Sequence, residues 1–365
     1  MTFPARSAIL KTGSALAVLL LIAACDGGSG GSSGANANAD SAVAGQALKI
    51  VGSSTVYPFT TAVAENFKNT YPGAATPIVE STGTGGGLKL FCAGVGQEYP
   101  DIANASRRIK MSEVEMCRDN GVENIIEIQV GIDGIAFAQS RDAQLFPLTA
   151  EDIYRALAAS APDGTENRLS NWSEVRTGLP DRRIEVLGPP PTSGTRDAFN
   201  ELVMQSGCEA VPEVAALEDQ DEALFEQRCT RLREDGVFVE AGENDNLIVQ
   251  KLVSNPVAIG IFGYSYLDEN LDKIAALDLN GAQPTYEQIA GGSYIAARPL
   301  YIYAKGEHMR AKPALKTFLM EYTGNAAIGP EGYLTGRGLI AAPDDIRAAN
   351  IDAATNGTPM DVSGL

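Results

Sequence analysis

The chain has 365 residues, a formal net charge of −18 at pH 7 and a single histidine. Such an acidic chain is a poor partner for nucleic acid, because a polyanion would be repelled. A small anion remains a possible ligand if local donors hold it. The length beyond residue 46 suffices for one large domain or two medium ones, and we expect a monomer.

The first 24 residues predict a lipoprotein signal peptide. Arg6 and Lys11 precede an apolar run from Ala15 to Ala24, which is shorter than the about 20 residues needed to span a bilayer. Small residues then lead to Cys25, as in bacterial lipoprotein signals whose cysteine is lipidated. The alternative is an ordinary secretory signal with an incidental cysteine. We therefore expect an exported, periplasmic protein, anchored to a membrane through Cys25.

A flexible tether is predicted to connect this anchor to the folded part. Residues 26–46 are almost wholly Gly, Ser, Ala, Asn and Asp, and such a composition cannot bury a core. We assign residues 25–46 to the lipidated cysteine and its tether.

Strands and helices alternate in the rest of the chain. In the first part of the chain, the patterns predict a strand over 48–51, a helix from 58, a strand over 78–80, a helix from 88, a strand over 99–106 and a helix over 111–119. Strands over 125–130 and 135–138 follow, then a helix over 148–157 with Thr149 as N-cap, a strand over 184–187 and a helix from 196. After an acidic irregular segment over 209–235, the patterns predict a helix over 247–255, strands over 258–263 and 300–304, and a helix over 308–322. This alternation favours an α/β fold with largely parallel sheets.

Three turns rich in glycine and hydroxyl groups each precede a helix. They lie at 52–58, 80–87 and 189–196. The first turn of a helix leaves backbone N–H groups unpaired at the positive end of the helix dipole, where an anion is stabilised. One such turn is weak evidence, and none carries the lysine of a phosphate-loop signature. Three in one chain predict an anion-binding site.

Four cysteines follow Cys25, and an even number in an exported chain predicts two disulfides. Of the three possible pairings we favour the sequence-local one, Cys92–Cys117 and Cys208–Cys229. Zinc is a poor alternative, because the only histidine is His308 and no Cys-x-x-Cys is present. No metal or cofactor is expected.

The motifs together resemble the phosphate-binding component of bacterial phosphate ABC transporters, a family of periplasmic binding proteins. Four ordered segments carry the resemblance: 52–58, 81–89, 101–107 and 192–196. It implies a two-lobed type II α/β fold with the ligand in a cleft between lobes joined by crossing strands. Lobe one would comprise 47–132 and 297–365, and lobe two 133–296. The implied function is noncovalent binding of inorganic phosphate and its delivery to an ABC permease in the inner membrane, without enzymatic activity.

The resemblance also implies ligand-binding residues in both lobes. In lobe one, Val56 and Tyr57 match backbone donors, and Ser54 or Thr55 beside them adds a hydroxyl. Thr84 matches a hydroxyl position that caps the second helix. The corresponding helix-start donors of lobe two are Ser193, Gly194 and Thr195.

Two positions depart from the best-known branch of that family. Ser106 stands in place of an aspartate, and Pro189 in place of an arginine. We predict that Arg107 and Arg196 supply the charge-assisted hydrogen bonds instead. The alternatives are a surface salt bridge for Arg107 or its neighbour Arg108, and an exposed first-turn position for Arg196.

The missing aspartate bears on specificity. At neutral pH phosphate keeps a proton and sulfate does not, so a carboxylate acceptor favours phosphate. The Ser106 hydroxyl accepts less selectively, and Glu80 or Asp133 could provide the carboxylate. Sulfate, molybdate or tungstate therefore remain alternative ligands.

Two further alternatives belong to other functional classes. A serine hydrolase or phosphatase on this fold would need a nucleophile and a base, but no Gly-x-Ser-x-Gly motif is present and His308 stands alone. The second alternative is a scavenging or adhesion lipoprotein that works without a transporter.

Overall fold

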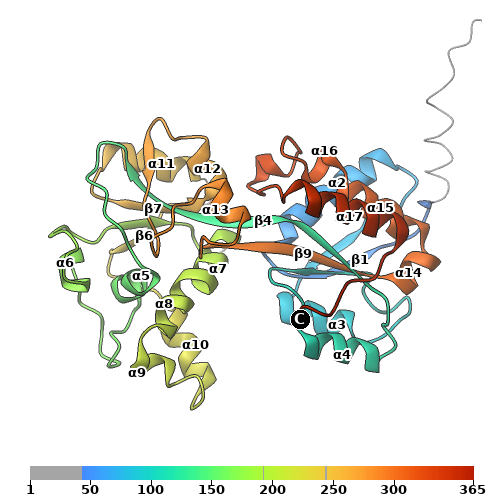
Figure 1. Ribbon diagram of the computed structural model, residues 1–365, viewed down its shortest axis with the longest axis horizontal. Helices are drawn as coiled ribbons and strands as arrows, with labels where there is room; N and C mark the ends of the chain where they lie inside the picture. The colour runs from blue at the N-terminus through green and yellow to red at the C-terminus, as the bar shows by residue number, and fades with distance from the viewer. Residues whose placement is uncertain (1–42, 192, 243–244) are drawn as a thin grey trace, which may run out of the picture.

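The computed structural model describes residues 43–191, 193–242 and 245–365. The chain forms two α/β lobes side by side, joined by two long strands that run through both (Figure 1). These are β4 (Ile125–Ser140) and β9 (Ala297–Lys305). They pair antiparallel from Ile125 opposite Lys305 to Gly134 opposite Ala297, with a register shift between Gln129 and Gly131.

The sheet of lobe one has the order β2-β1-β3-β9-β4. Strand β1 (Lys49–Gly52) lies parallel to β2 (Ile78–Ser81) and β3 (Ile102–Ala105), whereas β9 runs antiparallel to β3. Its helices are α2 (Tyr57–Thr70), α3 (Thr84–Phe91), α4 (Met111–Asp119), α14 (Gly306–Ala311), α15 (Pro313–Thr323), α16 (Asn325–Ile328), the 3-10 turn η2 (Thr335–Arg337) and α17 (Asp344–Asn356).

In lobe two, the second half of β4 pairs antiparallel with β7 (Ile259–Gly263) and β8 (Ile274–Ala276). Strand β5 (Val186–Gly188) lies parallel to both β7 and β6 (Phe238–Glu240). The helices are α5 (Ala150–Leu157), α6 (Trp172–Val175), α7 (Gly194–Phe199), the π-helix η1 (Asn200–Met204), α8 (Gln205–Glu209), α9 (Pro212–Ala215), α10 (Glu222–Thr230), α11 (Asp245–Ser254), α12 (Tyr264–Asp268) and α13 (Tyr286–Ala290).

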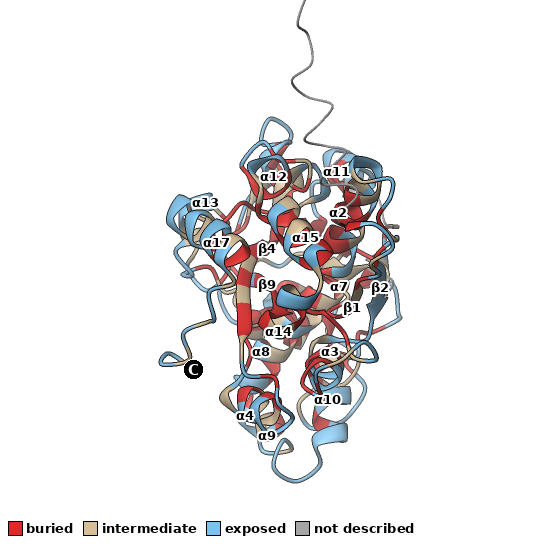
Figure 2. Cartoon of the chain, turned by 90° about the vertical axis from the view of Figure 1, so that its right-hand side faces the viewer, coloured by how far each residue is buried: buried red, intermediate tan, exposed pale blue. Residues whose placement is uncertain are grey.

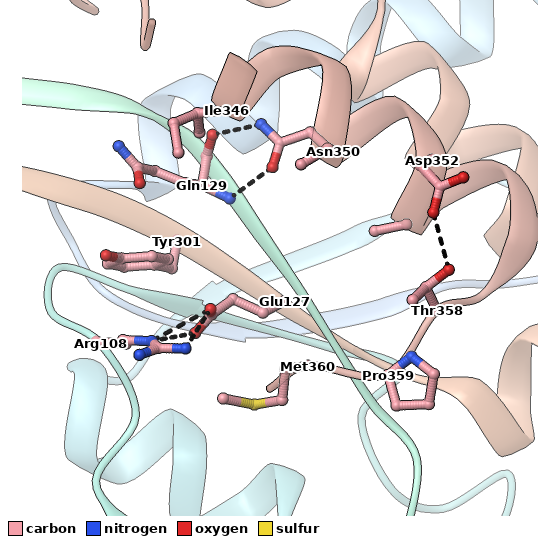
Figure 3. Close-up of a pocket in the computed structure, with 12 residues that line it drawn as sticks. Arg108, Glu127, Gln129, Tyr301, Ile346, Asn350, Asp352, Thr358, Pro359 and Met360 are labelled. Atoms are coloured by element: carbon pink, nitrogen blue, oxygen red, sulfur yellow. Dashed lines mark hydrogen bonds and ion pairs between the residues drawn. The ribbon is translucent and has the colours of Figure 1, made fainter. Parts of the chain in front are cut away.

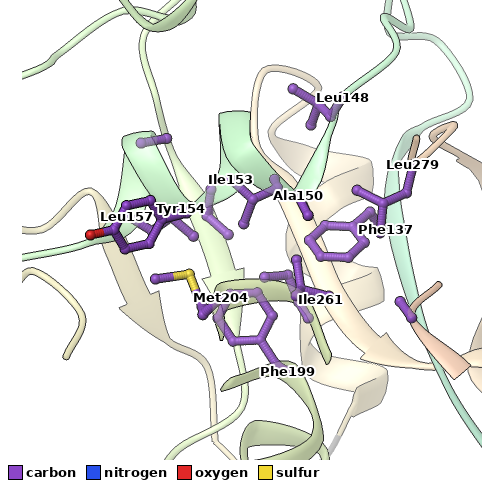
Figure 4. Packing of buried hydrophobic residues seen from close by; sticks show 14 of the residues in the cluster. Phe137, Leu148, Ala150, Ile153, Tyr154, Leu157, Phe199, Met204, Ile261 and Leu279 are labelled. Atoms are coloured by element: carbon purple, nitrogen blue, oxygen red, sulfur yellow. The ribbon is translucent and has the colours of Figure 1, made fainter. Parts of the chain in front are cut away.

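Each lobe buries its own apolar side chains. In lobe two Phe137, Tyr154 and Phe199 lie at the centre of the largest cluster (Figure 4). In lobe one Phe67, Phe318 and Tyr322 pack between α2, α15 and the sheet. Buried residues follow the strands and the inward sides of the helices, while the outer helix faces are exposed (Figure 2).

Several local predictions are confirmed. Helix α4 has the predicted bounds, and the side chains of Thr149 and Asp152 each accept the other's backbone N–H at the start of α5. The cysteines pair locally, Cys92 with Cys117 and Cys208 with Cys229.

Four predictions are wrong in detail. Residues 125–140 form one strand rather than two, because Gly131 and Gly134 keep an extended backbone against β9. The segment 209–235 contains helices α9 and α10. The helix over 308–322 is divided at Lys312, since a residue before proline is disfavoured in a helix. The sheet is mixed, because the crossing strands run antiparallel to their neighbours.

Candidate functional site

The three hydroxyl-rich turns lie at the carboxyl ends of parallel strands. The turn at 52–58 follows β1, that at 80–87 follows β2 and precedes α3, and that at 189–196 follows β5 and precedes α7. Ligands of open α/β sheets bind at this edge. The topology therefore brings helix beginnings from both lobes to the same region.

The turn after β1 is held closely against β3. Gly52 has φ +130°, and a Cβ there would overlap the backbone of Asn104, so the position requires glycine. The Ser53 amide donates to the Asn104 carbonyl at 2.9 Å. The Val56 amide lies 3.4 Å from the Ser53 hydroxyl, and the Tyr57 amide donates to the Ser53 carbonyl at 3.0 Å. The two predicted backbone donors thus have partners within the turn.

Thr84 and Ser106, both predicted site residues, contact each other. Their hydroxyl oxygens lie 3.0 Å apart, and the Ser106 amide donates to Thr84 Oγ1 at 3.1 Å. Thr84 begins α3, whose first turn packs on the backbone of Gly52 through Gly87. This hydroxyl pair therefore lies beside the turn after β1.

The start of α7 reaches the same turn from the other lobe. Ser54 Oγ donates to Asp197 Oδ2 at 2.9 Å. Gly194 faces Thr55 so closely that a Cβ on it would lie 3.5 Å from the Thr55 Cα. The lobes thus contact each other where two predicted ligand-binding turns meet.

Arg196 points away from this contact. Ser193 caps α7 by accepting the Thr195 amide at 3.2 Å. The Arg196 guanidinium donates to the Pro189 carbonyl at 2.8 Å and lies 4.6 Å from the Phe238 ring centroid. Burial lowers the pKa of Arg196. Its guanidinium therefore packs within lobe two, against the Phe238 ring of β6 and the Pro189 carbonyl that follows β5.

Arg107 and Arg108 are both engaged in ion pairs. Arg107 binds Glu113 of α4 through two hydrogen bonds of 2.9 and 2.8 Å, and this is the salt bridge expected as the alternative to ligand binding. Burial alone would raise the pKa of Glu113, but hydrogen bonds, chiefly from Arg107, outweigh it and lower that pKa. Arg108 binds Glu127 in a pocket of about 420 Å³ beside α17 (Figure 3). No residue of the three hydroxyl-rich turns lines that pocket.

An arginine that the sequence patterns did not indicate contacts the turn after β1. Arg298 of β9 is buried, and its Nη2 donates to Thr55 Oγ1 at 3.1 Å. It also pairs with Glu201 of η1, and its Nε lies 4.0 Å from Asp133 Oδ2. Arg298 and Thr55 are 243 positions apart, and no motif surrounds Arg298, so the sequence carries no signal that joins them.

His308 lies at the opposite end of the sheet from the three turns. Its Nδ1 is 2.7 Å from Asp101, which precedes β3, and its Nε2 accepts the Gly96 amide at 3.0 Å. Among the described residues no group of His, Cys, Asp and Glu could hold a metal ion. The helix beginnings therefore have no histidine base beside their hydroxyls.

Comparisons of the sequence with known proteins all point to one family. A profile of the PBP superfamily domain matches residues 33–326. Protein SphX of Synechococcus elongatus is 33% identical over 281 residues, 75% of this chain and 72% of SphX. The phosphate-binding protein PstS of Staphylococcus epidermidis is 28% identical over 346 residues, 92% of this chain and 90% of PstS.

Similarity to solved structures agrees with the profile. The crystal structure of a possible phosphate binding protein from Planctomyces limnophilus matches with a TM-score of 0.68 and 27% identity, over 86% of this chain and 99% of that one. The two lobes, the crossing strands and the extent of the profile match lead to one conclusion: the chain belongs to the PBP superfamily.

Proposed function

We propose that this protein binds inorganic phosphate noncovalently between its lobes and delivers it to an ABC-type permease. The observation that carries the proposal is the meeting of hydroxyl-rich helix beginnings from both lobes, where Ser54 contacts Asp197 and Thr55 faces Gly194. The names of PstS and of the Planctomyces protein support phosphate as the ligand. Two lobes are proposed, 47–132 with 297–365 and 133–296.

The binding energy of such a site is adequate. A hydrogen bond to a charged group contributes about 1.5–3 kcal/mol net, whereas micromolar affinity requires only about 8 kcal/mol. Several donors from Ser54, Thr55, Thr84 and the start of α7 would exceed that sum. The excess offsets dehydration of the anion and ordering of the lobes. Because donors come from both lobes, the ligand favours the closed arrangement.

We propose that the site prefers phosphate to sulfate. Asp197 already accepts a hydrogen bond from Ser54 at the lobe contact. A carboxylate acceptor favours a ligand that keeps a proton at neutral pH and repels one that does not. We propose that the Asp197 carboxylate supplies the proton acceptor that Ser106 does not.

The decisive experiment is calorimetric titration of the purified protein with phosphate and sulfate in parallel. Phosphate is expected to bind and sulfate to bind far more weakly. Thr84→Val should weaken phosphate binding about tenfold, the equivalent of one hydrogen bond. Tighter binding of sulfate, or no binding of phosphate, would refute the assignment. Hydrolysis of a phosphomonoester would favour the enzyme alternative.

We also propose export and anchoring through Cys25, which lies outside the described residues. Support comes from the signal-like residues 1–24 and the Gly- and Ser-rich tether. None of the described helices combines the length and the apolar composition that a membrane span requires. Cys25→Ser should release the protein from the membrane fraction, whereas continued membrane association would contradict the anchor. We further propose that the protein is a monomer and that its partner is the permease of an ABC transporter.

A further inference from the structure

Arg298 joins three parts of the chain at the lobe contact. It lies on the crossing strand β9, opposite Asp133 of β4 in the ladder. One Nη donates to Thr55 in the turn after β1, and the other pairs with Glu201, just beyond α7. The residue is only 8% exposed. A single buried cation therefore contacts the turn after β1 and the π-helix that follows α7.

The positive charge of Arg298 is balanced mainly by the solvent-exposed Glu201 rather than by the buried Asp133. Arg298 Nε and Asp133 Oδ2 are both buried without a hydrogen-bond partner, at a separation of 4.0 Å. Asp133 Oδ2 makes no hydrogen bond to Arg298 at this separation, so this carboxyl is a weak counter-charge. Burial raises the pKa of Asp133, against the opposing effect of Arg298. Glu201 is the better counter-charge, yet its side chain is 54% exposed.

A half-exposed carboxylate on a buried arginine can be exchanged. A buried charge must be paired, and solvent access lets Glu201 leave the guanidinium when another anion arrives. Glu201 belongs to the π-helix η1, a local departure from α-helical geometry of the kind often found at functional sites. Arg298 Nη1 is therefore a buried donor whose present acceptor, Glu201, is open to solvent.

We propose that Arg298 is the cationic ligand-binding residue of this protein, and that Glu201 holds its guanidinium until a tetrahedral oxyanion displaces it. The proposal rests on the oxyanion-binding function given above. Arg298 then binds the ligand beside Thr55, and its position on a strand shared by both lobes links ligand binding to their closure. Glu201 lowers the affinity by competition while keeping the unliganded arginine neutralised.

The test is calorimetry with inorganic phosphate at fixed ionic strength. Arg298→Gln should weaken binding about 10- to 150-fold, as expected for a charge-assisted hydrogen bond. Glu201→Gln should tighten it about fivefold, because the competitor is removed. In the double variant the effect of Glu201→Gln should vanish. Glu209→Gln, which removes an exposed charge from α8, controls for long-range electrostatics and should leave the affinity unchanged.

Several results would contradict the role proposed for Arg298 and Glu201. If Glu201→Gln weakens binding as Arg298→Gln does, the pair is a structural link and the proposal is wrong; wild-type affinity in Arg298→Gln also overturns it. If Arg298→Gln does not fold, Glu201→Gln alone decides, since unchanged or weaker binding excludes competition. Absence of phosphate binding by the wild-type protein refutes the proposed function itself, and with it this inference.

Discussion

Ser54 in the turn after β1 donates a 2.9 Å hydrogen bond to Asp197 of α7, and this bond connects the two lobes. Both residues belong to the helix beginnings that we assign to the ligand. The bond joins parts of the chain that are 143 positions apart. We therefore expect it to contribute to the balance between the open and closed arrangements that we propose for the lobes.

Ser54→Ala should shift that balance toward the open form. Loss of one hydrogen bond costs about 1 kcal/mol, or about a fivefold change in the closed-to-open ratio. Small-angle scattering without phosphate should show a larger radius of gyration. Ser173→Ala is a matched control, because Ser173 makes the same kind of bond to Asp181 within lobe two. Identical scattering from Ser54→Ala and wild type would contradict the prediction.

Arg196 should matter more for stability than for affinity. Its guanidinium packs on Phe238 and donates to the Pro189 carbonyl, away from Ser54. Losing a desolvated cation–π contact and a buried hydrogen bond costs about 2–3 kcal/mol. Denaturant unfolding of Arg196→Ala should show that loss, and Arg196→Met a smaller one. A tenfold loss of phosphate affinity with unchanged stability would instead place Arg196 on the ligand.

Local sequence patterns predicted the helix beginnings but not their side-chain partners. The capping pair of Thr149 and Asp152 depends on neighbouring residues alone, so the sequence suffices to predict it. The contact of Arg298 with Thr55 depends on how distant strands cross, which no short spacing records. Arg107 shows a different limit. Its position in a motif was visible, but the competing partner Glu113 decides where its guanidinium lies.

The two disulfides should stabilise the lobes to a similar extent. Cys92–Cys117 and Cys208–Cys229 have sequence separations of 25 and 21. Closing a loop of this length lowers the entropy of the unfolded chain, and this raises the free energy of unfolding by about 3 kcal/mol. Replacing either pair by alanines should reduce the free energy of unfolding accordingly. A reductant should lower the melting temperature of the wild type but not that of a variant lacking both pairs. An unaffected wild type would argue against one or both bridges.

Lys305 should give the protein an unusual gain in stability at mildly alkaline pH. The side chain is fully buried, its Nζ donates to the Gly94 carbonyl at 2.6 Å, and it lies 5.0 Å from the Phe91 ring centroid. Burial lowers the pKa of Lys305 to about 8, although Asp101 and Glu307 oppose the change. In the unfolded chain a lysine titrates near about 10.4. Between these values the unfolded state binds more protons than the native state, so stability rises with pH.

The rise should reach about 2 kcal/mol between about pH 7.5 and 9.5. That range lies below the ionisation of the buried tyrosines, the pKa values of which burial raises. Urea unfolding of the wild type across it is the measurement. Lys305→Met should remove this contribution, whereas Lys316→Met, which changes an exposed lysine of α15, should retain it. If Lys305→Met and wild type show the same pH dependence, Lys305 keeps an ordinary pKa and stays charged in the core.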